Sequence, residues 1–197
     1  MSTTLEDVKR FLDESQLKYV TNKDDSAVGI GFSCGDEETT FRDAEGDPHV
    51  RVIVKLAEKG EFVAFFVPHA WNVGESPNRA IVCEAAARLQ SRTKLIRFDL
   101  DEEGYLQPNI EIPLERAPLC AEQVHRALAG ILFAVRHFDP VFRHAIEAGE
   151  VDLDLVRDDM PEPPPEVMGL LDLAEDAGGL DELDRLLGDG DAPPIEP

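Results

Sequence analysis

The sequence predicts an α+β protein: a five-stranded antiparallel sheet with helices, in the order α-β-β-β-α-β-β-α, followed by an acidic C-terminal tail with short helices. Three observations predict this class. Five segments show the alternating or continuous apolar pattern of strands, and three others repeat apolar residues at the three- and four-residue spacing of helices. Short turns join the second strand to the third and the fourth to the fifth, which is typical of antiparallel hairpins.

Length and composition indicate one domain with an appendage. A chain of 197 residues, 43% of them hydrophobic, can bury one good core, so we expect a domain over residues 1–149 and an acidic, proline-rich tail over residues 150–197. There is no long apolar run and no charged-then-apolar leader, so we expect a soluble, cytoplasmic protein. Cys34, Cys83 and Cys120 fit neither a disulfide framework nor a zinc spacing, which favours reduced thiols.

The acidic charge is concentrated in the tail. The formal net charge is -22; residues 150–197 hold sixteen acidic residues against two basic ones, which gives -14, and residues 1–149 carry the other -8. This charge repels phosphate groups, so we expect neither nucleic acid nor an anionic membrane surface as a partner. A salt-loving or GC-rich host is an alternative source of part of the acidity.

The N-terminal part predicts a helix and then a strand. Thr3 and Glu6 stand at capping-box spacing and apolar residues follow at helical intervals, which predicts a helix over residues 4–16. Residues 26–33 alternate between large apolar and small side chains, which predicts the first strand. The small side consists of Ala27, Gly29 and Gly31. Glycines on that side indicate the close approach of another element.

The next two strands are expected to form a hairpin. Residues 50–56 place Val50, Val52, Val54 and Leu56 inward, and a turn at residues 58–60 leads into the segment EFVAFFV, residues 61–67. That segment is apolar on both faces, so it needs cover on both sides. We expect one of its faces under the last helix, namely Phe62, Ala64 and Phe66. The other face, Val63, Phe65 and Val67, is expected to stay open to a partner.

A second helix and two more strands follow. Ser76 and Pro77 form a helix start, and the helix is expected to end near residue 90. Residues 93–100 and 105–112 are the fourth and fifth strands, and because Pro108 has no N–H to donate, we expect the fifth strand at a sheet edge. The acidic turn between them begins like a calcium loop, but no carboxylate stands at the twelfth position, so a hairpin turn is the better interpretation.

The last helix is expected over residues 119–149, with Asp139 and Pro140 restarting or kinking it. It carries three histidines, His125, His137 and His144. No second metal ligand stands at a zinc-like spacing from any of them, so we expect surface or boundary histidines and neither a metal nor another cofactor.

Two segments carry a resemblance to a known group. The segment LKYV, residues 17–20, with its following turn and strand, and the run KLIRFDLDEEGYLQPNIEIPL, residues 94–114, occur here in the predicted element order. In these features the chain resembles the type III secretion chaperone-like fold, shared by the secretion chaperones and the YbjN family, over about residues 4–147. The resemblance implies a small, acidic, often homodimeric protein that binds extended segments of other polypeptides and has no catalytic residues. The long tail departs from the compact secretion chaperones.

The apolar second face of the sheet gives the leading functional hypothesis. We expect a non-enzymatic chaperone or adaptor that binds an extended or helical segment of a partner polypeptide, or a second copy of itself, on this face. The expected partner-binding residues are Ile53, Val63, Phe65 and Val67. The alternative is that these residues complete an intramolecular core.

Two other classes of function stay open. A regulatory subunit of a larger bacterial secretion or defence assembly would use the same surfaces on one fixed partner. An enzyme of unrecognised type has little support, because the chain contains no Gly-x-Ser-x-Gly, no Cys/His spacing, no metal motif and no phosphate loop. The segment around Trp71 is a candidate site edge, and the alternative is that it caps the core.

The tail carries a second hypothesis. After the proline-rich spacer at residues 160–165, two short acidic segments carry leucines at helical spacing: Leu170, Leu171 and Leu173, then Leu180, Leu183, Leu186 and Leu187. Each is too short to form a stable helix alone. A basic cluster in the body, Arg88, Arg92, Lys94 and Arg97, is a possible docking site for them. In this hypothesis the tail lies on the body, or on a neighbouring subunit, as a client would, until it is displaced. The alternative is an acidic tail that only increases solubility.

Overall fold

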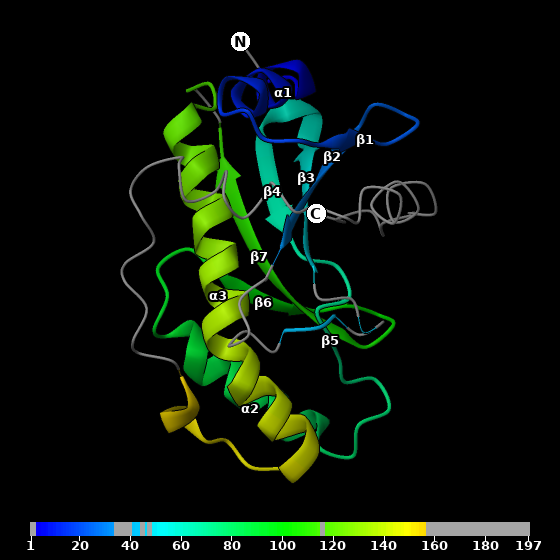
Figure 1. Ribbon diagram of the computed structural model, residues 1–197, viewed down its shortest axis with the longest axis vertical. Helices are drawn as coiled ribbons and strands as arrows, with labels where there is room; N and C mark the ends of the chain where they lie inside the picture. Colours follow the sequence, from blue (N-terminus) through cyan, green and yellow to red (C-terminus); the bar gives the residue numbers. More distant parts are fainter. Residues whose placement is uncertain (1–2, 34–40, 44–45, 47–48, 115–116, 157–197) are drawn as a thin grey trace.

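The computed structural model describes residues 3–33, 41–43, 46, 49–114 and 117–156 (Figure 1). The elements, in order, are α1 (Leu5–Glu14), β1 (Val20–Thr21), β2 (Ala27–Ser33), β3 (His49–Ala57), η1 (Glu58–Gly60), β4 (Phe62–Phe66), β5 (Trp71–Asn72), α2 (Arg79–Gln90), β6 (Arg97–Leu100), β7 (Tyr105–Pro113), α3 (Ala121–Ala148) and η2 (Leu153–Leu155). The predicted α+β class with an antiparallel sheet is confirmed. The sheet has seven strands in the described residues rather than five, because β1 and β5 are too short to show a pattern in sequence.

The strands pair in the order β1-β2-β3-β4-β7, all antiparallel, and β5 and β6 also pair with β7. Leu106 of β7 is opposite both Trp71 of β5 and Leu100 of β6, so β5 and β6 lie on opposite sides of β7. The last predicted strand is therefore interior, and its predicted place at an edge is wrong.

Pro108 is tolerated in this interior strand because its nitrogen lies beyond the β4 ladder. The last β4–β7 pair is Phe66 with Asn109, and the Pro108 carbonyl accepts from Val67 N at 3.2 Å, just past the end of β4. In a strand, the nitrogen and the carbonyl of one residue point to the same side. The missing N–H therefore falls where the regular pairing with β4 has already ended.

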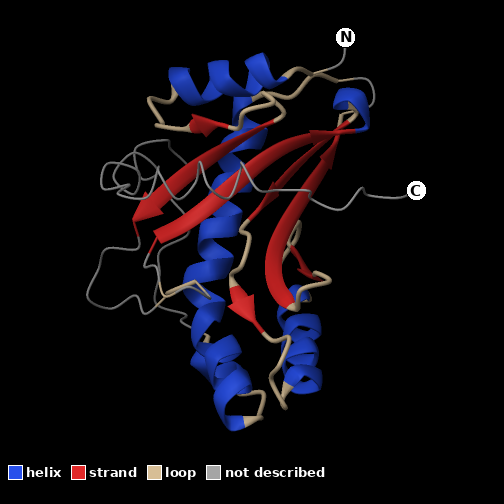
Figure 2. Ribbon diagram, turned by 90° about the vertical axis from the view of Figure 1, so that its right-hand side faces the viewer, coloured by secondary structure: helices blue, strands red, loops and turns tan. Residues whose placement is uncertain are grey.

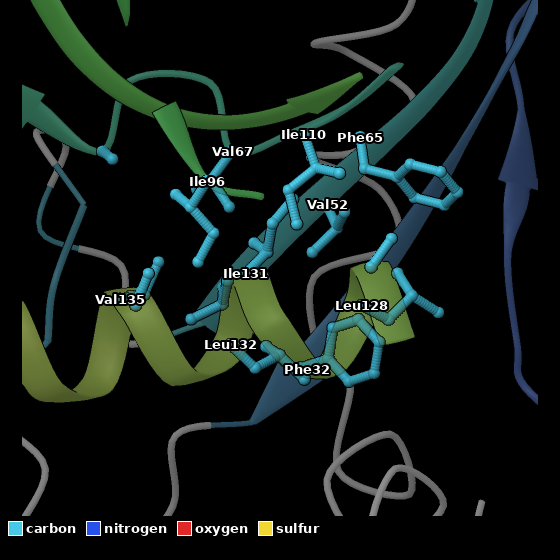
Figure 3. Packing of buried hydrophobic residues seen from close by; sticks show 14 of the residues in the cluster. Phe32, Val52, Phe65, Val67, Ile96, Ile110, Leu128, Ile131, Leu132 and Val135 are labelled. Atoms are coloured by element: carbon cyan, nitrogen blue, oxygen red, sulfur yellow. The ribbon is translucent and has the colours of Figure 1, made fainter. Parts of the chain in front are cut away.

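The helices cover one face of the sheet. α3 runs along the sheet and contacts β3, β4 and β7, while α1 lies at one end and α2 at the other (Figures 1 and 2). The main core fills the space between them. Leu128, Ile131, Leu132 and Val135 of α3 face residues that include Phe65 of β4, Val67 just after β4 and Ile110 of β7 (Figure 3). Along α3 these residues recur at the three- and four-residue spacing of one helix face.

The two faces of β4 are the reverse of the prediction. Val63 and Phe65 are fully buried and Val67 is 1% exposed, all in the main core, whereas Phe62 and Phe66 are half-buried on the opposite face. Val54 is opposite Phe65 and Leu56 is opposite Val63. Directly opposed residues in an antiparallel pair share a face. Because Val54 and Leu56 face inward, Phe65 and Val63 face inward as well.

The caps of two helices differ from the predicted ones, by one residue in α1 and by two residues in α2. Thr4, not Thr3, caps α1, in a capping box with Asp7, while Thr3 is buried and its Oγ1 accepts from Leu119 N at 3.0 Å. α2 begins at Arg79 after Asn78, because the Ser76 hydroxyl accepts from Asn78 N in a preceding turn. At α1 the contact of Thr3 with Leu119 leaves Thr4 as the cap.

α3 is continuous through Pro140, so it does not restart there. The preceding Asp139 is 1% exposed and accepts from Trp71 Nε1 at 2.9 Å and from Arg143 Nε at 2.9 and 3.0 Å. Arg143 also donates to the carbonyl of Arg42 at 2.6 Å. Trp71 is 3% exposed and packs on Phe142, so it caps the core, as the alternative interpretation of this segment proposed.

The β4 faces predict a contrast between two adjacent phenylalanines. Phe65→Ala leaves a cavity in the main core and should lower the free energy of unfolding by about 3 to 5 kcal/mol. Phe66→Ala removes a half-buried side chain from the other face and should cost about 1 kcal/mol. Urea unfolding of the two variants measures the difference; equal losses would contradict the assignment of faces.

A histidine joins α1 to α3. His125 Nε2 lies 2.5 Å from Ser15 Oγ, which in turn donates to the carbonyl of Phe11 at 2.7 Å. Because the serine hydroxyl has one hydrogen, His125 Nε2–H is the donor to Ser15. Burial lowers the pKa of His125 from its ordinary value, and the nearby Glu122 carboxylate opposes this shift.

The lowered pKa of His125 predicts a pH-dependent stability. The unfolded chain binds a proton at this histidine more readily than the folded chain, so stability should fall as the pH drops below the ordinary histidine pKa of 6.5. His125→Gln should reduce the loss of melting temperature between pH 7.5 and pH 5.5. If the variant and the parent chain lost the same amount, His125 would not contribute to the acid sensitivity.

Candidate protein-binding surface

The sheet face opposite the three helices, here called the outer face, is organised by the strand register. One cross-strand row runs through six strands. It consists of Val20, Gly29, Ile53, Phe66, Asn109 and Arg97. A neighbouring row consists of Ala27, Lys55, Ala64 and Glu111. The first row passes from apolar or small side chains on β1 to β4 to polar ones on β7 and β6, whereas the second row places Lys55 of β3 between Ala27 and Ala64 and ends at Glu111 of β7.

The apolar half of the outer face forms a cluster that is separate from the main core. Ala27 and Ile53 are 4% and 5% exposed, and the half-buried Val20 and Phe66 pack against them. We call these four residues the outer cluster. Gly29 lies between Val20 and Ile53 in the row and carries no side chain, so the cluster is shallow. A shallow apolar surface is suited to contact with a flat or extended partner.

The polar half of the outer face is compensated in charge. Arg97 Nε lies 3.0 Å from an Asp99 oxygen and Arg97 Nη1 lies 2.7 Å from Glu111. Asn109 Nδ2 donates to Asp99 at 2.8 Å. These groups are half-exposed, so each ion pair contributes little to stability. These groups satisfy one another's charges and hydrogen bonds. The apolar half is therefore the part of this face whose burial by a partner would be favourable.

A buried ion pair lies on the outer face next to the cluster. Arg51 Nη1 lies 2.5 Å from Asp43 Oδ2, and both side chains are about 95% buried. Arg51 lies on the outer face, and Asp43 covers it there. This pair fixes the segment at residues 41–43 beside β3, together with Phe41, which is buried in the main core.

The free edge of β2 adjoins the outer cluster. β2 pairs with β3 along its whole length, but β1 covers its other edge only at Val28 and Gly29. Among the described residues, no strand pairs with that edge from Ile30 onward. Backbone N–H and C=O groups at such an edge can pair with an added strand.

The structure separates the four predicted partner-binding residues. Ile53 lies in the outer cluster, whereas Val63, Phe65 and Val67 belong to the main core, where no partner can reach them. Phe66 and Val20 were missed. The hairpin register was the signal for Phe66, because a residue opposite the outward Ile53 must itself face outward.

The predicted basic cluster does not form one continuous positive patch. Arg88 is paired with Glu84, and Arg97 belongs to the compensated network on the outer face. Arg92 and Lys94 are exposed. The leucines predicted as the tail's interaction motif lie outside the described residues.

The histidines and the acidic turn are accounted for by packing and turn geometry. His137 is 2% exposed and stacks on Phe133 at 4.0 Å between ring centroids, and His69 stacks on Tyr105. Asp101 accepts from Tyr105 N at 2.7 Å, in the predicted hairpin turn.

Within the described ranges, no three His, Cys, Asp or Glu side chains are grouped as metal ligands. No described helix combines the length and apolar character needed to cross a bilayer.

Comparisons with known proteins find similarity among solved structures. No protein-family model matches the chain, and no curated protein matches it at a significant level. The chain is similar to a chain in a solved structure described as the HopA1-SchA chaperone-effector complex. The match covers 64% of this chain and 85% of that chain, with 16% sequence identity and a TM-score of 0.41. At this identity and TM-score it assigns no partner, binding mode or activity.

Proposed function

We propose that the protein is a non-enzymatic chaperone or adaptor that binds an extended segment of a partner polypeptide on the outer face. The observation that carries the proposal is the outer cluster: four apolar residues that pack together on the sheet face away from the helices, outside the main core. A domain of this size needs one core, and a second cluster on the opposite face gains when another chain covers it.

The gain on binding comes mainly from two residues of the cluster. Ile53 retains 5% exposure, whereas Val20 and Phe66 are half-buried. Completing the burial of a side chain such as Phe66 recovers part of the roughly 1.5 to 3 kcal/mol that full burial of a large apolar side chain is worth. Several such contacts are needed for a stable complex, so the partner must also use another feature of this face.

The free edge of β2 supplies that feature and favours an extended partner over a helical one. A strand added beside Ile30 to Ser33 would form main-chain hydrogen bonds, which give affinity regardless of sequence. Its side chains on the outer face would meet Gly29 and Gly31, which leave room, and the apolar surface of Ile53 next to them. Specificity then rests on alternate side chains of the partner. A second copy of the chain is the competing occupant of the same surface.

The proposal predicts a loss of binding from one outer-face substitution. Phe66→Asp places a charge in the outer cluster and should weaken binding of an unfolded polypeptide at least about tenfold, since one buried charge costs more than 1.4 kcal/mol. The probe is reduced and carboxymethylated α-lactalbumin, which cannot fold, and fluorescence anisotropy with the full chain measures the dissociation constant.

A matched control separates the outer cluster from exposed apolar surface in general. Leu155 is 36% exposed on η2, away from the sheet, so Leu155→Asp should bind the probe like the parent chain. Circular dichroism and light scattering of each variant report folding and oligomeric state. A parent chain that does not bind the probe, or a folded Phe66→Asp variant that binds it unchanged, would overturn the proposal.

A further inference from the structure

The connection between α2 and β6 displays an unusual leucine. Leu95 is 53% exposed, and among the described residues the next most exposed large hydrophobic side chain is Leu155, at 36%. Its neighbour Ile96 is 7% exposed and belongs to the main core. The chain therefore buries Ile96 in the core and leaves the preceding side chain, Leu95, in solvent.

The exposure of Leu95 is built into a well-fixed turn. Thr93 Oγ1 lies 3.1 Å from the carbonyl oxygens of both Gln90 and Ile96, so this hydroxyl joins the last turn of α2 to the start of β6. Arg92 N donates to the carbonyl of Leu89 at 2.9 Å. With both sides of the turn held, Leu95 cannot reach the core by a local rearrangement of the backbone.

Two cations, Arg92 and Lys94, come just before this leucine and have no described acidic partner. Arg88 is paired with Glu84 and Arg97 with Asp99 and Glu111, but neither Arg92 nor Lys94 forms an ion pair with a described residue. Cations at the C-terminal end of a helix interact favourably with its dipole, which accounts for their placement after α2. It does not account for the exposed leucine that follows them. We call Arg92, Lys94 and Leu95 the α2–β6 corner.

We propose that the chain's own residues 180–187 dock on the α2–β6 corner. This segment, LDELDRLL, carries Leu180, Leu183 and Leu187 at helical spacing with Asp181, Glu182 and Asp184 between them. It offers carboxylates to the two cations and leucine side chains to Leu95. In a chain of net charge -22, this corner is a place where a strongly acidic segment meets attraction rather than repulsion.

The segment is long enough to reach the corner from where the described chain ends. Gly149, which ends α3, lies against Asn78, and Asn78 Nδ2 donates to the carbonyl of Ile146 at 3.0 Å, so the chain leaves α3 beside the start of α2. The 12 residues of α2 span about 18 Å at 1.5 Å each. The 23 residues between Val156 and Leu180 include the proline-rich spacer and reach up to about 70 Å when extended at about 3.1 Å each, so they can cover this distance.

Covalent linkage makes such a weak contact effective. Exposed ion pairs are individually weak, so a separate peptide of this kind would bind the corner poorly. A linker that can cover the span makes docking intramolecular, which raises the effective concentration of the segment at the corner and favours the docked state. Because the charges are exposed, added salt should release the segment. The inference does not depend on binding at the outer cluster, since the α2–β6 corner shares no residue with it.

Hydrogen–deuterium exchange of the full chain at low salt tests the docking. Amides of residues 180–187 should exchange at least about threefold faster in Lys94→Glu and in Leu95→Ser than in the parent chain, and faster in the parent chain at 0.5 M salt. Lys23→Glu is the matched control, because Lys23 is exposed in the β1–β2 turn, at the far end of the molecule from α2 (Figure 1). It should leave the exchange unchanged.

Three outcomes would overturn the inference. Exchange of residues 180–187 at the rate of an unstructured peptide in the parent chain is the first, and equal protection in the parent, Lys94→Glu and Leu95→Ser chains is the second. Protection that rises with protein concentration is the third, because it places the segment on a second copy rather than on its own chain. Phe66→Asp should leave the protection unchanged, so a failure here is distinguishable from a failure of the proposed function.

Discussion

The register of the β3–β4 hairpin decides what each face of the sheet does. Val54 is opposite Phe65 and Ile53 is opposite Phe66, so each pair of neighbours in β4 is divided between the two faces. A shift by one residue would exchange the faces and place Phe66 under α3. With the observed register, Val63, Phe65 and Val67 complete the main core, and Phe66 joins Ile53 on the outer face. The candidate binding surface exists only because the hairpin pairs in this way.

The rest of the molecule supports that division. α3 is continuous through Pro140, and the adjacent Asp139, held by Trp71 and Arg143, ties this part of the helix to β5. On the other face, the network of Arg97, Asp99 and Glu111 satisfies its own charges. The outer cluster lies between these ions and the free edge of β2, so apolar surface and unpaired backbone occur side by side. That combination is what an extended polypeptide can use.

Much of the fold was predictable from periodicity, and the failures have physical causes. The five longer strands and three helices occur in the predicted order, because each buries enough side chains to show a pattern. β1 and β5 contain two residues each and show none. Pro108 predicts an edge strand because it has no N–H, but this N–H is missing at the point where the pairing with β4 ends. In β4 both faces are apolar, so alternation alone could not tell core from surface. Of the predicted site, Ile53 was placed on the correct face; Phe66 followed from the register and was missed.

The most direct test of the central claim is a map of which methyl groups respond to a bound polypeptide. The full chain, labelled at isoleucine and valine methyl groups, is titrated with carboxymethylated α-lactalbumin and followed by NMR. The account predicts saturable changes at Ile53 and Val20 on the outer face, with Val63 and Ile110 in the main core unchanged. Saturable changes confined to groups outside the outer face, or no change at Ile53 and Val20 at saturation, would contradict it.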